Sequence, residues 1–108
     1  MTEFAVAKSA PQHLRALERA NEVRLARAAL KRRIAARETS VASVVAEPPA
    51  EAERMTIGEL LMSQKRWGRQ RSKRLLVSIG LLENKELGTL TDRQRVVLAA
   101  VLQRRPTT

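Results

Sequence analysis

The sequence contains no cysteine and no tyrosine, and it has one tryptophan, one phenylalanine and one histidine in 108 residues. The absence of cysteine excludes disulfides, thiol nucleophiles and cysteine-based zinc sites, and a single histidine makes a histidine-based metal cluster untenable. With two aromatic side chains, any core has to be aliphatic. No apolar run approaches the roughly 20 residues of a membrane span, and no secretion signal is recognisable. We therefore expect a cytoplasmic protein without cofactor, metal or membrane.

Catalytic arrangements are also missing. No Ser/His/acid set, no paired carboxylates and no phosphate-binding loop can be recognised. A chain of this length also buries limited apolar surface, which leaves little room for an enclosed substrate pocket. These features argue against an enzyme and favour a small binding protein.

Positive charge is what the sequence has in excess. It holds 21 Lys and Arg residues against 11 Asp and Glu residues, a net charge of +10. Such an excess points to a polyanionic partner, with nucleic acid first. The charge is segregated into −1 over residues 1–7, +7 over 8–37, −4 over 38–53 and +8 over 54–108. We interpret the acidic stretch, which contains Pro48-Pro49, as a linker between two basic parts.

Helical spacing and capping residues predict an all-α chain without strands. The expected order is a tail over residues 1–10, a basic helix over 11–38, a short helix and acidic proline linker over 39–54, a helical module over 55–104 and a tail over 105–108. Ser9 is the expected cap of the basic helix, and Ser40 that of the short helix. Within the module, the expected helices are 57–63, opened by Thr56, 70–79, closed by Gly80, and 92–104, opened by Thr91.

The basic helix carries two apolar stripes, neither of them wide. We expect the helix to be a long basic arm that docks along one stripe. The first stripe consists of Ala16, Val23, Leu30 and Ile34. The second, weaker stripe consists of Leu14, Leu17, Leu25 and Ala28. Because both stripes are narrow, nothing in the pattern demands a dimer, and a monomer is expected.

A run of ten residues holds six bases and no acid. A turn containing Gly68 leads there into a helix, whose free N–H groups and positive dipole end suit a phosphate. Glycine lets backbone amides approach a sugar-phosphate chain closely, and the bases add charge-assisted hydrogen bonds. The predicted DNA-binding residues are Lys65, Arg66, Trp67, Gly68, Arg69, Gln70, Arg71, Ser72, Lys73 and Arg74.

Two roles remain open beside this run. Trp67 is either a wedge or stacking platform for bases or a core side chain packed on Leu60, Leu61 and Leu75, and we expect packing. Five bases of the first helix form either a second DNA-binding surface or solubilising charge: Arg24, Arg27, Lys31, Arg32 and Arg33.

The order of elements resembles the helix-two-turn-helix module. More narrowly, the chain resembles a divergent member of the actinobacterial type of integration host factor. The matching residues are Gly58-Glu59-Leu60-Leu61, the Gly68-Arg69 turn, Lys73-Arg74-Leu75-Leu76 and Leu90-Thr91-Asp92-Arg93-Gln94-Arg95. The last segment brings Arg93 into the predicted DNA-binding set.

The resemblance implies a nucleoid-associated protein that is not an enzyme. Such a protein binds double-stranded DNA with little sequence preference, bends or compacts it and assists site-specific recombination, which makes a site-specific recombinase a candidate partner. Two features depart from the family pattern. Gln70 stands where an aliphatic residue is expected, and the second turn, residues 83–89, is acidic, so a DNA contact is not carried over to it.

Two other functions compete with this interpretation. The same module and charge pattern suit a structured-RNA-binding protein. Alternatively, the first helix pairs with a partner helix of a recombinase or polymerase subunit. That adaptor hypothesis predicts binding that is sensitive to polar substitution of Leu30 and Ile34.

Overall fold

The computed structural model describes residues 11–104, in which helices joined by turns are the only extended regular elements. Its only β-type pairing is an isolated antiparallel bridge between Thr56 and Glu86. The predicted all-α fold is therefore confirmed. The predicted tails, residues 1–10 with the expected cap Ser9 and residues 105–108, lie outside the described residues.

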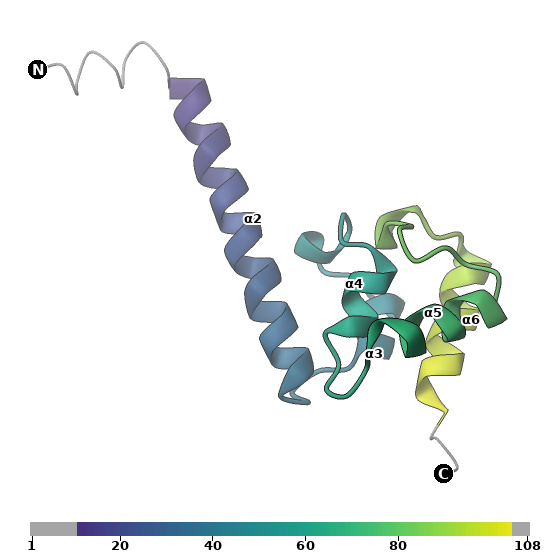
Figure 1. Ribbon diagram of the computed structural model, residues 1–108. Helices are drawn as coiled ribbons and strands as arrows, with labels where there is room; N and C mark the ends of the chain where they lie inside the picture. The colour runs from purple at the N-terminus through teal and green to yellow at the C-terminus, as the bar shows by residue number, and fades with distance from the viewer. Residues whose placement is uncertain (1–10, 105–108) are drawn as a thin grey trace, which may run out of the picture.

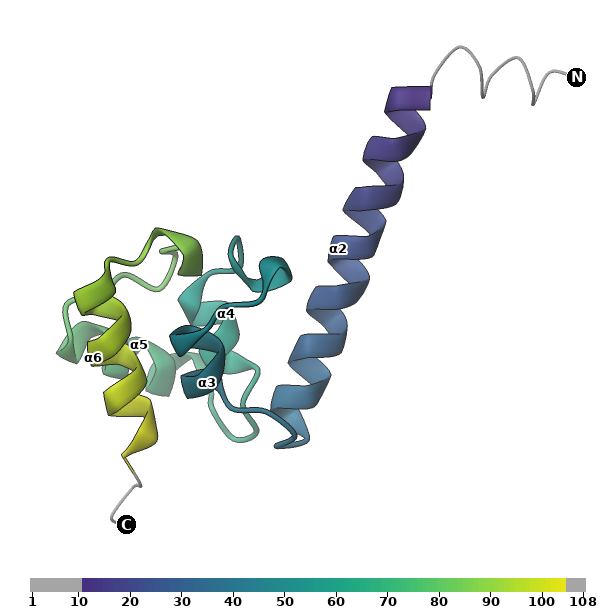
Figure 2. The same cartoon turned by 180° about the vertical axis from the view of Figure 1, so that it is seen from behind.

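The first described helix, α2 (Pro11–Ala35), lies beside a cluster of short helices and projects beyond it (Figures 1 and 2). Only its C-terminal turns are packed, with Leu30 and Ile34 1% and 3% exposed. Val23, on the same stripe, is 40% exposed, so docking along the whole stripe is wrong. A helix of 25 residues is about 37 Å long, more than the short helices can cover.

The next helix, α3 (Val41–Ala46), is a core element. Ser40 caps it as predicted, its hydroxyl accepting a hydrogen bond from the Ser43 amide. Four of its six residues are buried, and it packs against α6 (Asp92–Gln103). The 3-10 helix η1 (Ala50–Ala52) then buries Ala52. The acidic stretch is therefore more than a linker, because the valines of α3 and Ala52 of η1 are part of the core.

Local signals position the remaining helices, α4 (Ile57–Met62), α5 (Arg69–Ser78), the 3-10 helix η2 (Leu87–Thr89) and α6. Thr56 caps α4, and Thr91 and Gln94 form a reciprocal capping box at α6, as predicted. Gly80 ends α5 in the left-handed conformation, with φ +76°. All three ends agree with the sequence-based expectations to within a residue or two.

The core is aliphatic, as the shortage of aromatics requires. It is built around Leu60 and Leu61 of α4, Leu76 of α5 and Leu98 of α6, each at most 1% exposed. Arg95 joins this core to α3, because its guanidinium donates to the Val45 carbonyl at 3.0 Å. A basic residue of α6 therefore has a structural role.

The second turn is held against the start of α4 by backbone hydrogen bonds. The Gly58 amide donates to the Glu83 carbonyl, and the Gly88 amide donates to the Glu53 carbonyl. A Cβ at Gly58 would lie 2.9 Å from the Glu83 oxygen, and one at Gly88 would lie 3.0 Å from the Glu53 oxygen. Both glycines are thus required by close backbone approach.

Gly58→Ala is expected to lower the free energy of unfolding by about 1–3 kcal/mol, because backbone has to shift to admit the methyl group. Chemical denaturation measures the loss. Gly68→Ala is the matched control, since a Cβ there would meet nothing within 4 Å. Its loss is expected to stay below about 1 kcal/mol, the difference between glycine and alanine at a helix N-cap. Equal losses for both variants would contradict the steric explanation.

Candidate nucleic-acid interface

Gly68 is the N-cap of α5, in the turn that follows α4. Its backbone is extended, with φ −88° and ψ 178°, and no side chain caps the helix there. Neither this conformation nor the surrounding space demands glycine, because a Cβ would meet no atom within 4 Å. The bare backbone leaves the N–H groups of the first turn of α5 open to an external acceptor.

Arg66, two residues earlier, has the reverse property. Its φ is +71°, in the left-handed region that costs an ordinary side chain about 1–2 kcal/mol. Glycine would fit position 66 better, and any residue would fit position 68. Position 66 therefore holds an arginine, although its backbone conformation favours glycine. Position 68 holds a glycine, although its backbone conformation does not require one. A phosphate ligand would account for both choices, because it is attracted to the cation and approaches the bare amides.

Trp67, between these two residues, holds Arg71 in place. The Arg71 guanidinium lies over the indole, 4.1 Å from the ring centroid. The ring itself is half-buried and packs against the hydrophobic core, as expected. Arg71 covers one face of the ring, and the cation–π attraction stabilises this arrangement. Trp67 therefore serves to position the Arg71 guanidinium.

Ser72 is misplaced in the predicted binding set. It is 1% exposed, and its hydroxyl donates to the Gly68 carbonyl at 3.0 Å. Its position one turn into α5 directs it to the core side, next to Leu76. Ser72 therefore closes the first turn of the helix and offers nothing to a ligand.

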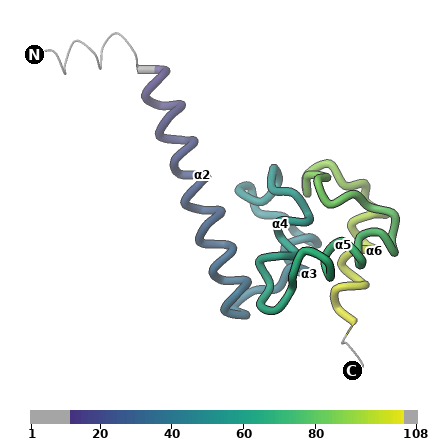
Figure 3. Tube along the Cα trace, in the orientation of Figure 1, coloured from purple at the N-terminus to yellow at the C-terminus, as the bar shows by residue number. Residues whose placement is uncertain are grey.

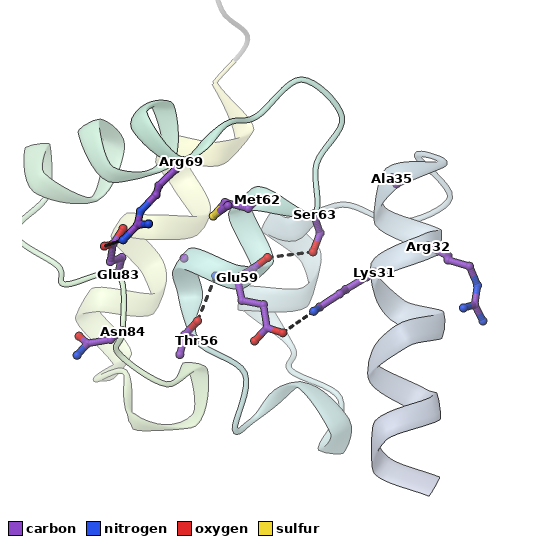
Figure 4. A pocket seen from close by; sticks show the side chains of 11 residues that line it. Lys31, Arg32, Ala35, Thr56, Glu59, Met62, Ser63, Arg69, Glu83 and Asn84 are labelled. Atoms are coloured by element: carbon purple, nitrogen blue, oxygen red, sulfur yellow. Dashed lines mark hydrogen bonds and ion pairs between the residues drawn. The ribbon is translucent and has the colours of Figure 1, made fainter. Parts of the chain in front are cut away.

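The six bases of the run are all exposed. Arg69 is paired with Glu83 at 3.8 Å, but its side chain remains 77% exposed, so the pair is weak (Figure 4). Helical spacing puts Arg69 and Lys73 on one flank of α5 and Arg71 on the other. Gln70 and Arg74 are exposed between these flanks, which gives α5 a broad cationic start.

Arg93 lies apart in sequence and element. It is exposed in the first turn of α6. It is therefore accessible, but it belongs to a helix start other than that of α5.

The basic residues of α2 divide into two groups. Arg27 donates to the Glu51 carbonyl at 3.2 Å, and Lys31 forms an ion pair with Glu59 at 2.5 Å. Figure 4 shows Lys31 directed to α4 and Arg32 directed away from it. Arg24, Arg32 and Arg33 are exposed. Two of the five predicted bases therefore fasten α2 to the other helices, and three are free for a second surface.

A hollow of about 680 Å³ separates this part of α2 from α4 and the second turn (Figure 4). Lys31 and Arg32 line one side, Arg69 and Glu83 the other, and Met62 adds an apolar side chain. Its charged lining includes both basic and acidic side chains. The hollow therefore does not extend the cationic surface at the start of α5.

One exposed base was missed by the sequence analysis. Arg37 follows α2 in the left-handed conformation, with φ +64°. It lines a hollow together with Lys65 and Trp67 of the basic turn. No local pattern marks Arg37, because its nearness to the turn depends on how α2 packs.

Residues 11–104 contain no cluster of three acidic, histidine or cysteine side chains able to hold a metal. No helix in the same range is long and apolar enough to cross a bilayer.

These features define a class: a small, aliphatic-cored all-α protein with a cationic turn leading into a helix start. A solved structure of sIHF, an integration host factor, bound to an 8-bp palindromic DNA has the same fold, with a TM-score of 0.71. The two sequences are 24% identical over 79% of this chain and 98% of that chain. No protein-family model and no curated protein matches this sequence. The chain therefore has the fold of the sIHF structure, in agreement with the helical fold that the resemblance implies.

Proposed function

We propose that this protein is a non-enzymatic, nucleoid-associated DNA-binding protein. It binds double-stranded DNA mainly through phosphates, with low sequence specificity, and bends or compacts it. It is proposed to be a divergent member of the actinobacterial type of integration host factor. The observation that carries the proposal is the composition of the α4–α5 turn, with Arg66 in a strained conformation and Gly68 in an unconstrained one.

The proposed primary contact is a backbone phosphate at the start of α5. The amides after Gly68 donate to it, and Arg66, Arg69 and Arg71 supply charge-assisted hydrogen bonds around it. Lys65, Gln70, Lys73, Arg74 and Arg93 are proposed as surrounding contacts. Trp67 contributes by holding Arg71. Contacts of these groups with phosphates carry no direct information about the base sequence, which accounts for low sequence specificity.

Duplex-DNA binding by the wild type is expected to weaken steeply with salt. If the six bases neutralise about six phosphates, log K falls with log salt at a slope of roughly −5. Trp67 is the only tryptophan, so its fluorescence reports directly on the turn. A flat salt dependence, or a fluorescence signal indifferent to DNA, would contradict the proposal. Equal competition by structured RNA would favour the RNA-binding alternative.

Bending is proposed to need a second contact, from the three exposed bases of α2. Buried Leu30 and Ile34 fix this helix to the core, so its charges keep their position relative to α5. Two fixed cationic surfaces can offset a bending cost on the order of 1–6 kcal/mol.

Replacing Arg24, Arg32 and Arg33 together by Gln is expected to reduce the bend while leaving most of the affinity. Energy transfer between dyes at the two ends of a duplex measures the bend. Arg15→Gln/Arg19→Gln is the control, because it removes exposed charge from the distal half of α2. An undiminished bend in the triple variant would overturn the proposed second surface.

Two further features complete the proposal. We expect a monomer, which sedimentation equilibrium tests, and we regard a site-specific recombinase as a candidate partner.

The adaptor alternative loses its predicted contacts, because Leu30 and Ile34 are in the core and cannot meet a partner helix.

A further inference from the structure

A second hollow lies between the turn after α2 and the turn before α5. These two turns lie next to each other at the same end of the molecule in both views and in the Cα trace (Figures 1, 2 and 3). The hollow has a volume of about 550 Å³. Its charged lining residues are Arg37 and Glu38 from the first turn and Lys65 from the second. The basic turn at Gly68 thus has two sides, and one of them faces this hollow.

The hollow is otherwise lined by polar groups, one aromatic ring and the aliphatic residues Ile34 and Val41. The hydroxyls of Thr39, Ser40 and Ser43 are used within the α3 cap, where Ser43 donates to the Ser40 carbonyl. Trp67 lines the hollow and also carries Arg71 on its ring. Two cations against one carboxylate leave the lining positive, which suits an anion.

Arg37 occupies a position where glycine is the usual residue. The Glu38 amide donates to the Arg33 carbonyl, and the Arg37 amide donates to the Ile34 carbonyl, the hydrogen bonds of a left-handed helix end. Helix α5 ends with the same pair of bonds, made by Leu81 and by the left-handed Gly80. Helices α2 and α5 therefore end with the same hydrogen bonds, but the left-handed residue is arginine in α2 and glycine in α5.

Among residues 11–104, Arg37 and Arg66 are the only non-glycine residues with positive φ. Arg37 lines the hollow, and Arg66 lies directly between two of its lining residues, Lys65 and Trp67. Arg37 would be less strained as glycine, so this position loses stability and gains a cation that lines the hollow. An anionic ligand in the hollow explains this choice, as the phosphate at the start of α5 explains Arg66.

We propose that this hollow is a second phosphate site, bound through Arg37 and Lys65. It rests on the proposed function, because its occupant is a backbone phosphate of the same duplex that binds at the start of α5. The site adjoins the Gly68 turn, so a strand leaving that turn can continue along Lys65 to Arg37. It extends the contact surface beyond the residues of the basic run.

The test compares Arg37→Gly with the wild type in duplex-DNA titrations across a salt series. Affinity is expected to fall about 5- to 10-fold at ~0.1 M salt, and the salt slope to become smaller by about 1. The midpoint of thermal unfolding is expected to stay unchanged or rise, because the strain is relieved. A purely structural role for Arg37 cannot produce weaker binding together with a more stable fold.

Three further variants sharpen the result. Lys65→Gln removes the other cation and is expected to have a similar effect without any backbone change. Arg37→Lys keeps the charge and is expected to retain most of the affinity. Arg54→Gln removes one exposed charge after η1 and is expected to change the affinity less than 2-fold.

The outcomes separate this inference from the proposed function. If the wild type binds DNA while Arg37→Gly binds with unchanged affinity and slope, the second site is overturned and the proposed function stands. If Arg37→Gly loses only the ability to bridge two duplexes, the phosphate in the hollow belongs to a second duplex, and the proposal that it belongs to the same duplex is wrong. If the wild type binds no DNA, both are overturned.

Discussion

Arg69→Glu/Arg71→Glu is expected to lower duplex-DNA affinity at least about 100-fold at ~0.1 M salt. Two charge-assisted contacts of about 1.5–3 kcal/mol each are lost, and two carboxylates then repel the phosphates. The salt slope is expected to shrink from roughly −5 to about −3, because at least two phosphates are no longer neutralised. The fold should survive, since both side chains are exposed and the Arg69–Glu83 pair is weak.

Arg15→Glu/Arg19→Glu makes the same change in net charge on the exposed distal half of α2. Its effect is expected to stay below about 10-fold, the contribution of long-range attraction alone. If both double variants lose affinity equally, binding follows the net charge of the protein and the turn at Gly68 is not a local site. If neither loses affinity, the DNA-binding surface lies elsewhere.

Leu30→Ala/Ile34→Ala is expected to lower the free energy of unfolding by about 4–10 kcal/mol. Each substitution removes a large buried aliphatic side chain and leaves a cavity, which costs about 2–5 kcal/mol. The loss is a large part of the 5–15 kcal/mol that stabilises a typical domain. It is also the reason that α2 cannot be deleted as a detachable arm. Urea denaturation followed by circular dichroism measures the change.

Leu17→Ala/Leu25→Ala is the matched control, with the same helix and nearly the same chemistry at exposed positions. These leucines are 54% and 62% exposed, so each change is expected to matter by no more than about 0.5 kcal/mol. A small loss for Leu30→Ala/Ile34→Ala, together with lost binding to a partner protein, would favour the adaptor hypothesis and contradict the burial of these residues.

Helix ends were the most predictable part of the fold. Thr56, Thr91 and Gly80 act on backbone groups three to five residues away, so the relevant interactions lie within a few residues of the sequence. The same holds for the start of α5, where the basic run and Gly68 are adjacent in sequence. The candidate site could therefore be assigned to one turn before its geometry was known, and DNA binding by that turn stays a prediction.

The errors came from long-range packing. The stretch around α3 reads as acidic and proline-containing, yet its apolar side chains meet α6 from far along the chain. Ser72 lies inside the basic run, but its place on the core side of α5 buries it. Among the bases of α2, contacts with Glu51 and Glu59 decide which are used structurally, and those residues are 24 and 28 positions away.

The sequence by itself determined the helical class, the cationic character, the helix ends and the turn that we propose binds DNA. These properties follow from composition and from interactions between residues close in the chain. Only the tertiary structure decided that apolar residues within 39–54 belong to the core, and that α2 is anchored by its C-terminal turns. It also brought Arg37 beside the basic turn. Each depends on which distant surfaces pack together, and that is set by the shape of the whole core.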